Sequence, residues 1–202
     1  MASVEVLLLA GAPGSGKSTI AKQFVSMELL SKGAQHLSIG DLKRSVVSGE
    51  RPSRWAELLQ QKAHPDRKTG AAPSKAMTGI MEEFILDNPE ALTIIDGFPR
   101  YTDRIEPFKA SMINIGANVL GLSVVQTDEP VLRERLAVRA PRHDQELGSA
   151  EFVDERLADH RDNILPTIAR LSEAYPTLFL DGSIEPEINA ALLLDFYTSL
   201  QP

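Results

Sequence analysis

A glycine-rich loop near the N-terminus constrains the fold of this chain more than any other feature. Residues 11–18 read Gly-Ala-Pro-Gly-Ser-Gly-Lys-Ser, which matches the phosphate-binding pattern G-x-x-x-x-G-K-S. The run at 4–10 before the loop is nearly all apolar, as in a parallel strand buried on both faces. After the loop, the apolar residues of 19–32 recur at helical spacing. This order of strand, loop and helix predicts a phosphate site, rather than an ordinary turn, at the N-terminus of the helix.

Each part of this loop has a physical role in holding a nucleotide. The glycines allow backbone N–H groups to turn inward around a phosphate. We expect the ammonium group of Lys17 to lie beside the β- and γ-phosphates and the hydroxyl of Ser18 to bind Mg²⁺. The residues expected to bind the nucleotide are Gly11, Ala12, Pro13, Gly14, Ser15, Gly16, Lys17, Ser18 and Thr19.

The composition of the chain favours a single soluble domain. Its 202 residues are 43% hydrophobic and 24% charged, enough to bury a sizeable core without disulfides. It has no cysteine, which excludes a disulfide framework and a cysteine-based metal or redox site and agrees with a reducing cytoplasm. The formal net charge of −7 argues against general nucleic-acid binding. Because the sequence contains no leader-like or membrane-spanning segment, we expect a cytoplasmic monomer without membrane or nucleic-acid partners.

A second apolar run ends in a carboxylate. Residues 92–96 read Leu-Thr-Ile-Ile-Asp, which predicts a buried strand with Asp96 at its carboxyl end. In a phosphate-loop protein such an aspartate lies near the Mg²⁺ ion, although a strand-end aspartate can also simply cap the next loop. Arg100 follows at the edge of the sheet where open α/β sheets bind ligands.

The remaining apolar patterns alternate between strands and helices. Further strands are expected at 36–39, 119–125 and 178–180, and the intervening helices include 73–88 and 187–200. The fold class is therefore α/β, a doubly wound parallel sheet of five strands with helices on both faces.

Three local expectations refine this reading. Asp41 is expected to cap the helix that holds Arg44. A long helix over about 153–175 is expected to be kinked near Pro166. His160 lies on the apolar stripe of that helix and is expected to belong to the core rather than to bind a ligand.

Several arginines lie where a phosphate site could use them. Arg135 and Arg139 are four residues apart on one helical face, Arg142 follows in a loop, and Arg156 lies off the apolar stripe of the next helix. Isolated surface arginines are usually solvated, but phosphoryl transfer needs cations around the moving group. The flanking polar stretches are read as two mobile inserts, an acceptor-binding insert at about 41–72 and a short lid at about 139–151.

Together, these motifs resemble the adenylate kinase family of nucleoside monophosphate kinases over essentially the whole chain. The segments that carry the resemblance are GAPGSGKST at 11–19, HLSIGDLKR at 36–44, IIDGFPR at 94–100, RLAVR at 135–139, RHD at 142–144 and ERLADHRDNILP at 155–166. The phosphate loop alone is common to many nucleotide-binding proteins, whereas the ordered set is far more specific.

The resemblance implies a single kinase domain, 1–202, that moves the γ-phosphoryl of ATP to a nucleoside monophosphate with Mg²⁺. The implied catalytic residues are Lys17, Arg100, Arg139, Arg142 and Arg156, with Arg135 beside the bound ATP. The implied acceptor-binding residues are Ile39, Arg44, Gly97, Arg100 and Arg104, and the implied metal-binding residues are Ser18 and Asp96.

Three departures from the family pattern concern the acceptor and the lid. Ile39 stands where AMP-selective members usually have threonine, and Arg104 where they usually have glutamine. Because arginine only donates hydrogen bonds, it cannot accept one from an adenine amino group. The paired lid aspartates of the family become Asp144-Gln145. The acceptor therefore stays open between AMP, another nucleotide and another phosphorylated compound.

Two alternative functions and the identity of the phosphoryl donor also stay open. One is a kinase acting on a hydroxyl, for which Asp41 would be the carboxylate near the attacking group. Another is a nucleotide-binding regulatory protein with little catalysis. The choice between ATP and GTP as donor is open as well.

Overall fold

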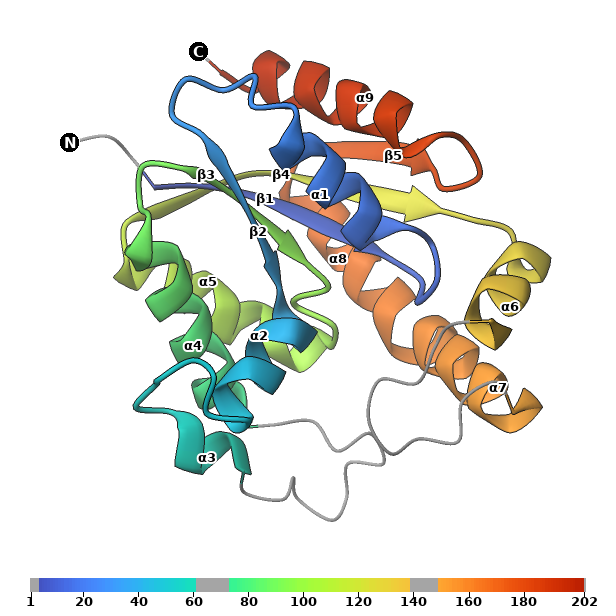
Figure 1. The fold of residues 1–202 in the computed structure, drawn as a ribbon, viewed down its shortest axis with the longest axis horizontal. Helices are drawn as coiled ribbons and strands as arrows, with labels where there is room; N and C mark the ends of the chain where they lie inside the picture. The colour runs from blue at the N-terminus through green and yellow to red at the C-terminus, as the bar shows by residue number, and fades with distance from the viewer. Residues whose placement is uncertain (1–3, 61–72, 139–148, 202) are drawn as a thin grey trace.

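The structure is a sheet of five parallel strands with a layer of helices on each face (Figure 1). It is a computed structural model that describes residues 4–60, 73–138 and 149–201. The strand order is β2-β3-β1-β4-β5. The strands are β1 (Val4–Gly11), β2 (Ala34–Ser38), β3 (Leu92–Asp96), β4 (Ala117–Gln126) and β5 (Thr177–Asp181). The predicted five-stranded parallel α/β fold is confirmed.

The strands are apolar on both faces because helices cover both. Leu7 and Leu9 of β1 pack on one side, where α1 (Lys17–Ser26) and α9 (Pro186–Ser199) lie. Val6 and Leu8 point the other way, as the alternation of a strand requires. The helices of that second face include α4 (Ser74–Asp87), α5 (Ile105–Asn114) and α8 (Leu165–Ala174).

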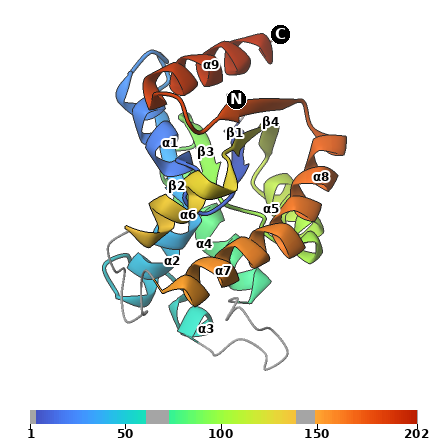
Figure 2. The ribbon, with the colours of Figure 1, turned by 90° about the vertical axis from the view of Figure 1, so that its right-hand side faces the viewer.

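The other helical segments gather toward the carboxyl ends of the strands (Figures 1 and 2). They are α2 (Ile39–Val47), α3 (Ala56–Gln60), the 3₁₀ turn η1 (Thr102–Arg104), α6 (Glu129–Ala137), α7 (Ala150–Asp159) and the π turn η2 (His160–Ile164). None of the helices in the described part of the chain is long and apolar enough to cross a membrane.

The start of α2 differs from the sequence expectation. Asp41 does not cap this helix, because α2 already begins at Ile39 and Ser38 is its cap. The hydroxyl of Ser38 accepts a hydrogen bond from the Asp41 N–H at 3.4 Å. The chain leaves β2 at Ser38, so the capping position falls three residues earlier than predicted, and Asp41 instead lies in the first turn, where the helix dipole favours a carboxylate.

The long helix expected over 153–175 is interrupted just before Pro166. The N–H of Leu165 bonds to the carbonyl of His160, the i→i+5 bond of a π turn. Pro166 has no N–H to continue the regular α-helical ladder. The expectation that His160 lies in the core is wrong, because its side chain is only half-buried.

The two expected inserts are only partly described. The described part of the first one holds α2 and α3, which pack beside α4. Residues 61–72 and 139–148 lie outside the described residues, and with them Arg139, Arg142, Asp144 and Gln145.

Candidate functional site

The glycine loop closes around the side chain of Lys17. β1 ends at Gly11 and α1 begins at Lys17, and the Lys17 ammonium group donates to the Ala12 carbonyl at 2.7 Å and to Ser15 Oγ at 3.4 Å. Gly11 has φ +141° and faces the Val125 carbonyl of β4, an approach that leaves no room for a side chain. The loop thus holds a buried cation at the N-terminus of α1, where the helix dipole also favours an anion.

A carboxylate meets this helix from the neighbouring strand. The register pairs Leu9 of β1 with Asp96 of β3, which puts Asp96 at the carboxyl edge of the sheet. Ser18 Oγ donates to Asp96 Oδ2 at 2.5 Å, and His36 Nε2 lies 3.4 Å from the same oxygen. Burial raises the pKa of Asp96, but the hydrogen bond from His36, the charge of Lys17 and the hydroxyl of Ser18 outweigh it and hold the pKa below its ordinary value. Asp96 is therefore a buried carboxylate kept ionised.

Ser18 and Asp96 are suited to Mg²⁺ that arrives with a nucleotide. Both offer oxygen, the atom type that this ion prefers. Among the described residues no group of three His, Cys, Asp or Glu side chains could hold a metal ion by itself. Mg²⁺ usually keeps several waters and binds through one or two protein groups plus substrate phosphates, so the pair at 2.5 Å fits that arrangement.

We expect Asp96→Asn to raise the Mg²⁺ concentration needed for the half-maximal rate by about 10- to 100-fold. This is the usual effect of losing a group that orients a metal ion and its waters. The measurement is the Mg²⁺ concentration for half-maximal rate, with the exposed α9 residue in Asp195→Asn as the matched control. An unchanged Mg²⁺ dependence would contradict this role.

The same variant tests the acid dependence of stability. Because the folded-state pKa of Asp96 is depressed, its ionised form stabilises the fold above the unfolded pKa of about 4. That contribution is lost as the pH falls through the folded-state pKa. The acid unfolding profile of Asp96→Asn should lack this component.

A second wall of the site comes from α6 and α7, which lie next to each other in Figure 2. Ala12 of the loop packs in one apolar cluster with Leu132, Leu136, Val153 and Leu157. Arg135 of α6 donates to the Gly182 carbonyl at 2.8 Å. Gly182 itself packs against the loop, since a Cβ there would lie 2.5 Å from the Ser15 carbonyl. Arg135 is therefore anchored to a turn that supports the loop.

Arg156 lies on α7, the helix that carries Leu157 of the Ala12 cluster. Its guanidinium lies over the Phe152 ring, 5.0 Å from the ring centre. Arg156 directly precedes Leu157, whose side chain packs in the Ala12 cluster.

The expected acceptor residues lie partly on the loop after β3. The guanidinium of Arg100 comes back over Gly97, with Nε 3.9 Å from where a Cβ would lie, and the Arg100 carbonyl accepts from Thr167 at 3.2 Å. Arg104 is buried at 3% exposure, and its guanidinium lies 5.7 Å from the centre of the Tyr101 ring. Ile39 is part of the core cluster beneath α2.

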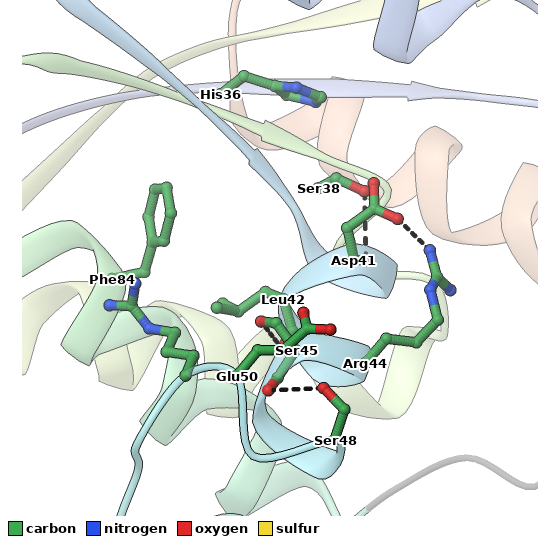
Figure 3. A pocket seen from close by; sticks show the side chains of 10 residues that line it. His36, Ser38, Asp41, Leu42, Arg44, Ser45, Ser48, Glu50 and Phe84 are labelled. Carbon is green, nitrogen blue, oxygen red and sulfur yellow. Dashed lines mark hydrogen bonds and ion pairs between the residues drawn. The ribbon is translucent and has the colours of Figure 1, made fainter.

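A pocket of about 570 Å³ opens along α2 (Figure 3). Its lining residues are His36, Ser38, Asp41, Leu42, Arg44, Ser45, Ser48, Glu50, Arg51 and Phe84. Arg44 alone of the expected acceptor residues lines it, and Arg44 pairs with Asp41 across one helical turn. Ile39, Gly97, Arg100 and Arg104 are not part of this pocket.

The structure thus brings Lys17, Ser18 and Asp96 together, and it adds two residues that sequence reasoning missed as site residues. His36 contacts Asp96, and His160 lies three residues after Leu157, which packs with Ala12 of the phosphate loop. No local sequence signal could have found the contact of His36, because it depends on the pairing of β2 with β3.

Comparisons with known proteins agree with this geometry. A family model described as an AAA domain matches residues 10–152. An adenylate kinase from Corynebacterium diphtheriae is 30% identical over 191 residues, which cover 93% of this chain and 96% of the relative. Adenylate kinase 1 from Synechocystis sp. is 28% identical over 184 residues, 91% of each chain. By its sequence and by the loop that surrounds Lys17, the chain belongs to the adenylate kinase family.

Proposed function

We propose that this protein transfers the γ-phosphoryl group of ATP to a nucleoside monophosphate, reversibly and with Mg²⁺ bound to the donor. The observation that carries the proposal is the grouping of Lys17, Ser18 and Asp96 at the ends of β1 and β3, with Arg100 following on the same edge. The relatives reported above are named adenylate kinases, which points to the same reaction.

The donor side of the site offers positive charge and hydrogen-bond donors to the phosphates of ATP. When a nucleotide binds, Lys17 exchanges its contact with the Ala12 carbonyl for the β- and γ-phosphates, and the loop N–H groups donate to the same oxygens. Ser18 and Asp96 would hold Mg²⁺, which would supply positive charge to the phosphate oxygens. Arg135 lies beside the donor.

The acceptor side of the site offers arginines to the phosphate of the nucleoside monophosphate. Arg44 and Arg100 hold the acceptor phosphate, and Gly97, Ile39 and Arg104 lie around the rest of the acceptor. An oxygen of the acceptor phosphate forms a bond to the γ-phosphorus while the bond from that phosphorus to the β–γ bridging oxygen breaks. Both the attacking and the leaving group are phosphate oxygens, so no strong general base is needed. Arg156, Arg139 and Arg142 surround the moving group, the last two outside the described residues.

The full proposal covers the whole chain. One kinase domain spans 1–202, with the acceptor-binding insert at about 41–72 and the lid at about 139–151. It acts as a monomer in the cytoplasm, with nucleotides as its partners.

An acceptor panel tests the proposed reaction class. We expect ADP to form from Mg·ATP only when a nucleoside monophosphate is added, with AMP among those used. Sugars and polyols, which offer hydroxyl acceptors, should give none. Turnover with a hydroxyl compound alone, or saturable ATP binding without turnover on any acceptor, would contradict the proposal.

The departure at Arg104 from the family pattern can be tested in the same assay. If Arg104 contacts the acceptor base, Arg104→Gln should shift preference toward AMP, because glutamine both donates and accepts hydrogen bonds. An unchanged profile would mean that the buried Arg104 has a structural role instead.

A further inference from the structure

Helix α7, the π turn η2 and helix α8 follow one another as one helical rod (Figure 2). This rod contacts both the phosphate loop and the loop after β3. Near one end, Leu157 packs in the same apolar cluster as Ala12 of the phosphate loop. Farther along, Thr167 donates to the carbonyl of Arg100 at 3.2 Å. The residues between these two contacts therefore belong to a segment that is anchored to the phosphate loop at one point and to the loop after β3 at the other.

His160 lies in this interval, at the first position of the π turn. It follows Arg156 by four residues, so the two side chains share one helical face next to Leu157. Its ring is half-buried. π turns are rare and often occur at functional sites. His160 is thus a half-buried titratable residue of the helical segment that also carries Leu157.

The charges around His160 favour a neutral ring in the absence of a ligand. Burial lowers the pKa of His160 below its ordinary value of 6.5, and the positive charge of Lys17 lowers it further. On its own helical rod, Asp159 raises the pKa and Arg161 lowers it. The position of the ring agrees with this, because Leu157, three residues earlier on the same helical rod, packs with Ala12, whose carbonyl accepts the hydrogen bond of Lys17.

A bound polyphosphate would reverse this balance. It brings several negative charges to Lys17, which compensates the repulsion that Lys17 exerts on an imidazolium ring. We propose that His160 is a further phosphate-facing residue of the donor site, which takes up a proton from solvent when a nucleoside triphosphate binds beside Lys17. This inference rests on the proposed kinase function. The protonated His160 ring would add a cation to the arginines around the moving phosphoryl group only while the donor is bound.

Nuclear magnetic resonance of the histidine rings tests the proposal directly on the full chain. The chain has only four histidines, and His160→Gln identifies the resonance of His160 by its loss. The probe is Mg²⁺ with the β,γ-imido analogue of ATP, which is not turned over. We expect the pKa of His160 to rise by about one unit or more on saturation, a tenfold or larger change in the proton equilibrium.

Affinity measurements with the same analogue separate phosphate binding from a structural role. Relative to wild type, His160→Gln should bind the analogue about tenfold more weakly near pH 5.5 and nearly equally near pH 8.5, because only the protonated ring contributes. Taking the difference between the two proteins cancels the protonation of the nucleotide itself. A difference that is constant with pH would overturn the proposal.

The inference about His160 and the proposed kinase function can be contradicted separately. If the analogue binds and shifts the amide signals of residues 11–18 while the pKa of His160 stays unchanged, the inference about His160 is wrong and the kinase proposal stands. If the analogue does not bind at all, the proposed function itself fails. The wild-type titration does not depend on how well the variant folds.

Discussion

Replacing Lys17 by alanine should lower the rate of phosphoryl transfer by about 10³-fold or more while the protein stays folded. Lys17 is the buried cation at the centre of the loop, and its ammonium group is already held at 2.7 Å from the Ala12 carbonyl. Without Lys17 the β- and γ-phosphates lose an interaction with a positive charge, and this interaction is stronger in the transition state than in the ground state. The maximal rate should therefore fall. Steady-state rates with saturating ATP and acceptor measure the effect.

The control for this variant is another lysine of the same helix. Lys22 of α1 is exposed, and Lys22→Ala removes an equal charge away from the loop. It should leave the rate within about twofold of wild type, since exposed surface substitutions have small effects. A Lys17→Ala protein that keeps a rate similar to that of Lys22→Ala would contradict the assignment of the donor site.

Replacing Gly11 by alanine should reduce the free energy of unfolding by about 3 kcal/mol or more. A Cβ at this position would lie 2.4 Å from the Val125 carbonyl of β4, and the backbone has φ +141°, which side chains rarely allow. The clash falls between two central strands of the sheet, where the neighbouring backbone cannot easily move. Urea unfolding followed by circular dichroism measures the loss, and binding of Mg·ATP should weaken with it.

Gly33 provides the matched control for the backbone effect. It also has positive φ, +76°, but a Cβ there would meet nothing within 4 Å. Gly33→Ala should therefore cost only about 1–2 kcal/mol, the strain of the left-handed conformation. If both variants lost the same free energy of unfolding, the close approach of the Val125 carbonyl would not be what excludes a side chain at position 11.

The parts of the site that follow from local pattern could be predicted from the sequence. The loop at 11–18 and the strand at 92–96 could be located because motif spacing and apolar runs determine them directly. Their meeting also followed, since parallel strands present their carboxyl ends at one edge. The 2.5 Å contact between Ser18 and Asp96 agrees with that expectation.

Two features depend on geometry that periodicity does not encode. The apolar stripe placed His160 in the core because the pattern assumes 3.6 residues per turn throughout. The i→i+5 bond changes this spacing after His160, and the ring itself is half-buried although Leu157 before it and Ile164 after it are buried. Likewise, the contact of His36 with Asp96 depends on β2 lying next to β3, a pairing that no local pattern in 34–38 determines.

The fate of the γ-phosphoryl group tests the central claim most directly. The protein is incubated with Mg²⁺, ATP labelled in its γ-phosphate and unlabelled AMP, and the products are separated. The account predicts label in the β-phosphate of ADP, dependent on both AMP and Lys17. Label appearing only as inorganic phosphate, or remaining entirely in ATP with every nucleoside monophosphate offered, would contradict it.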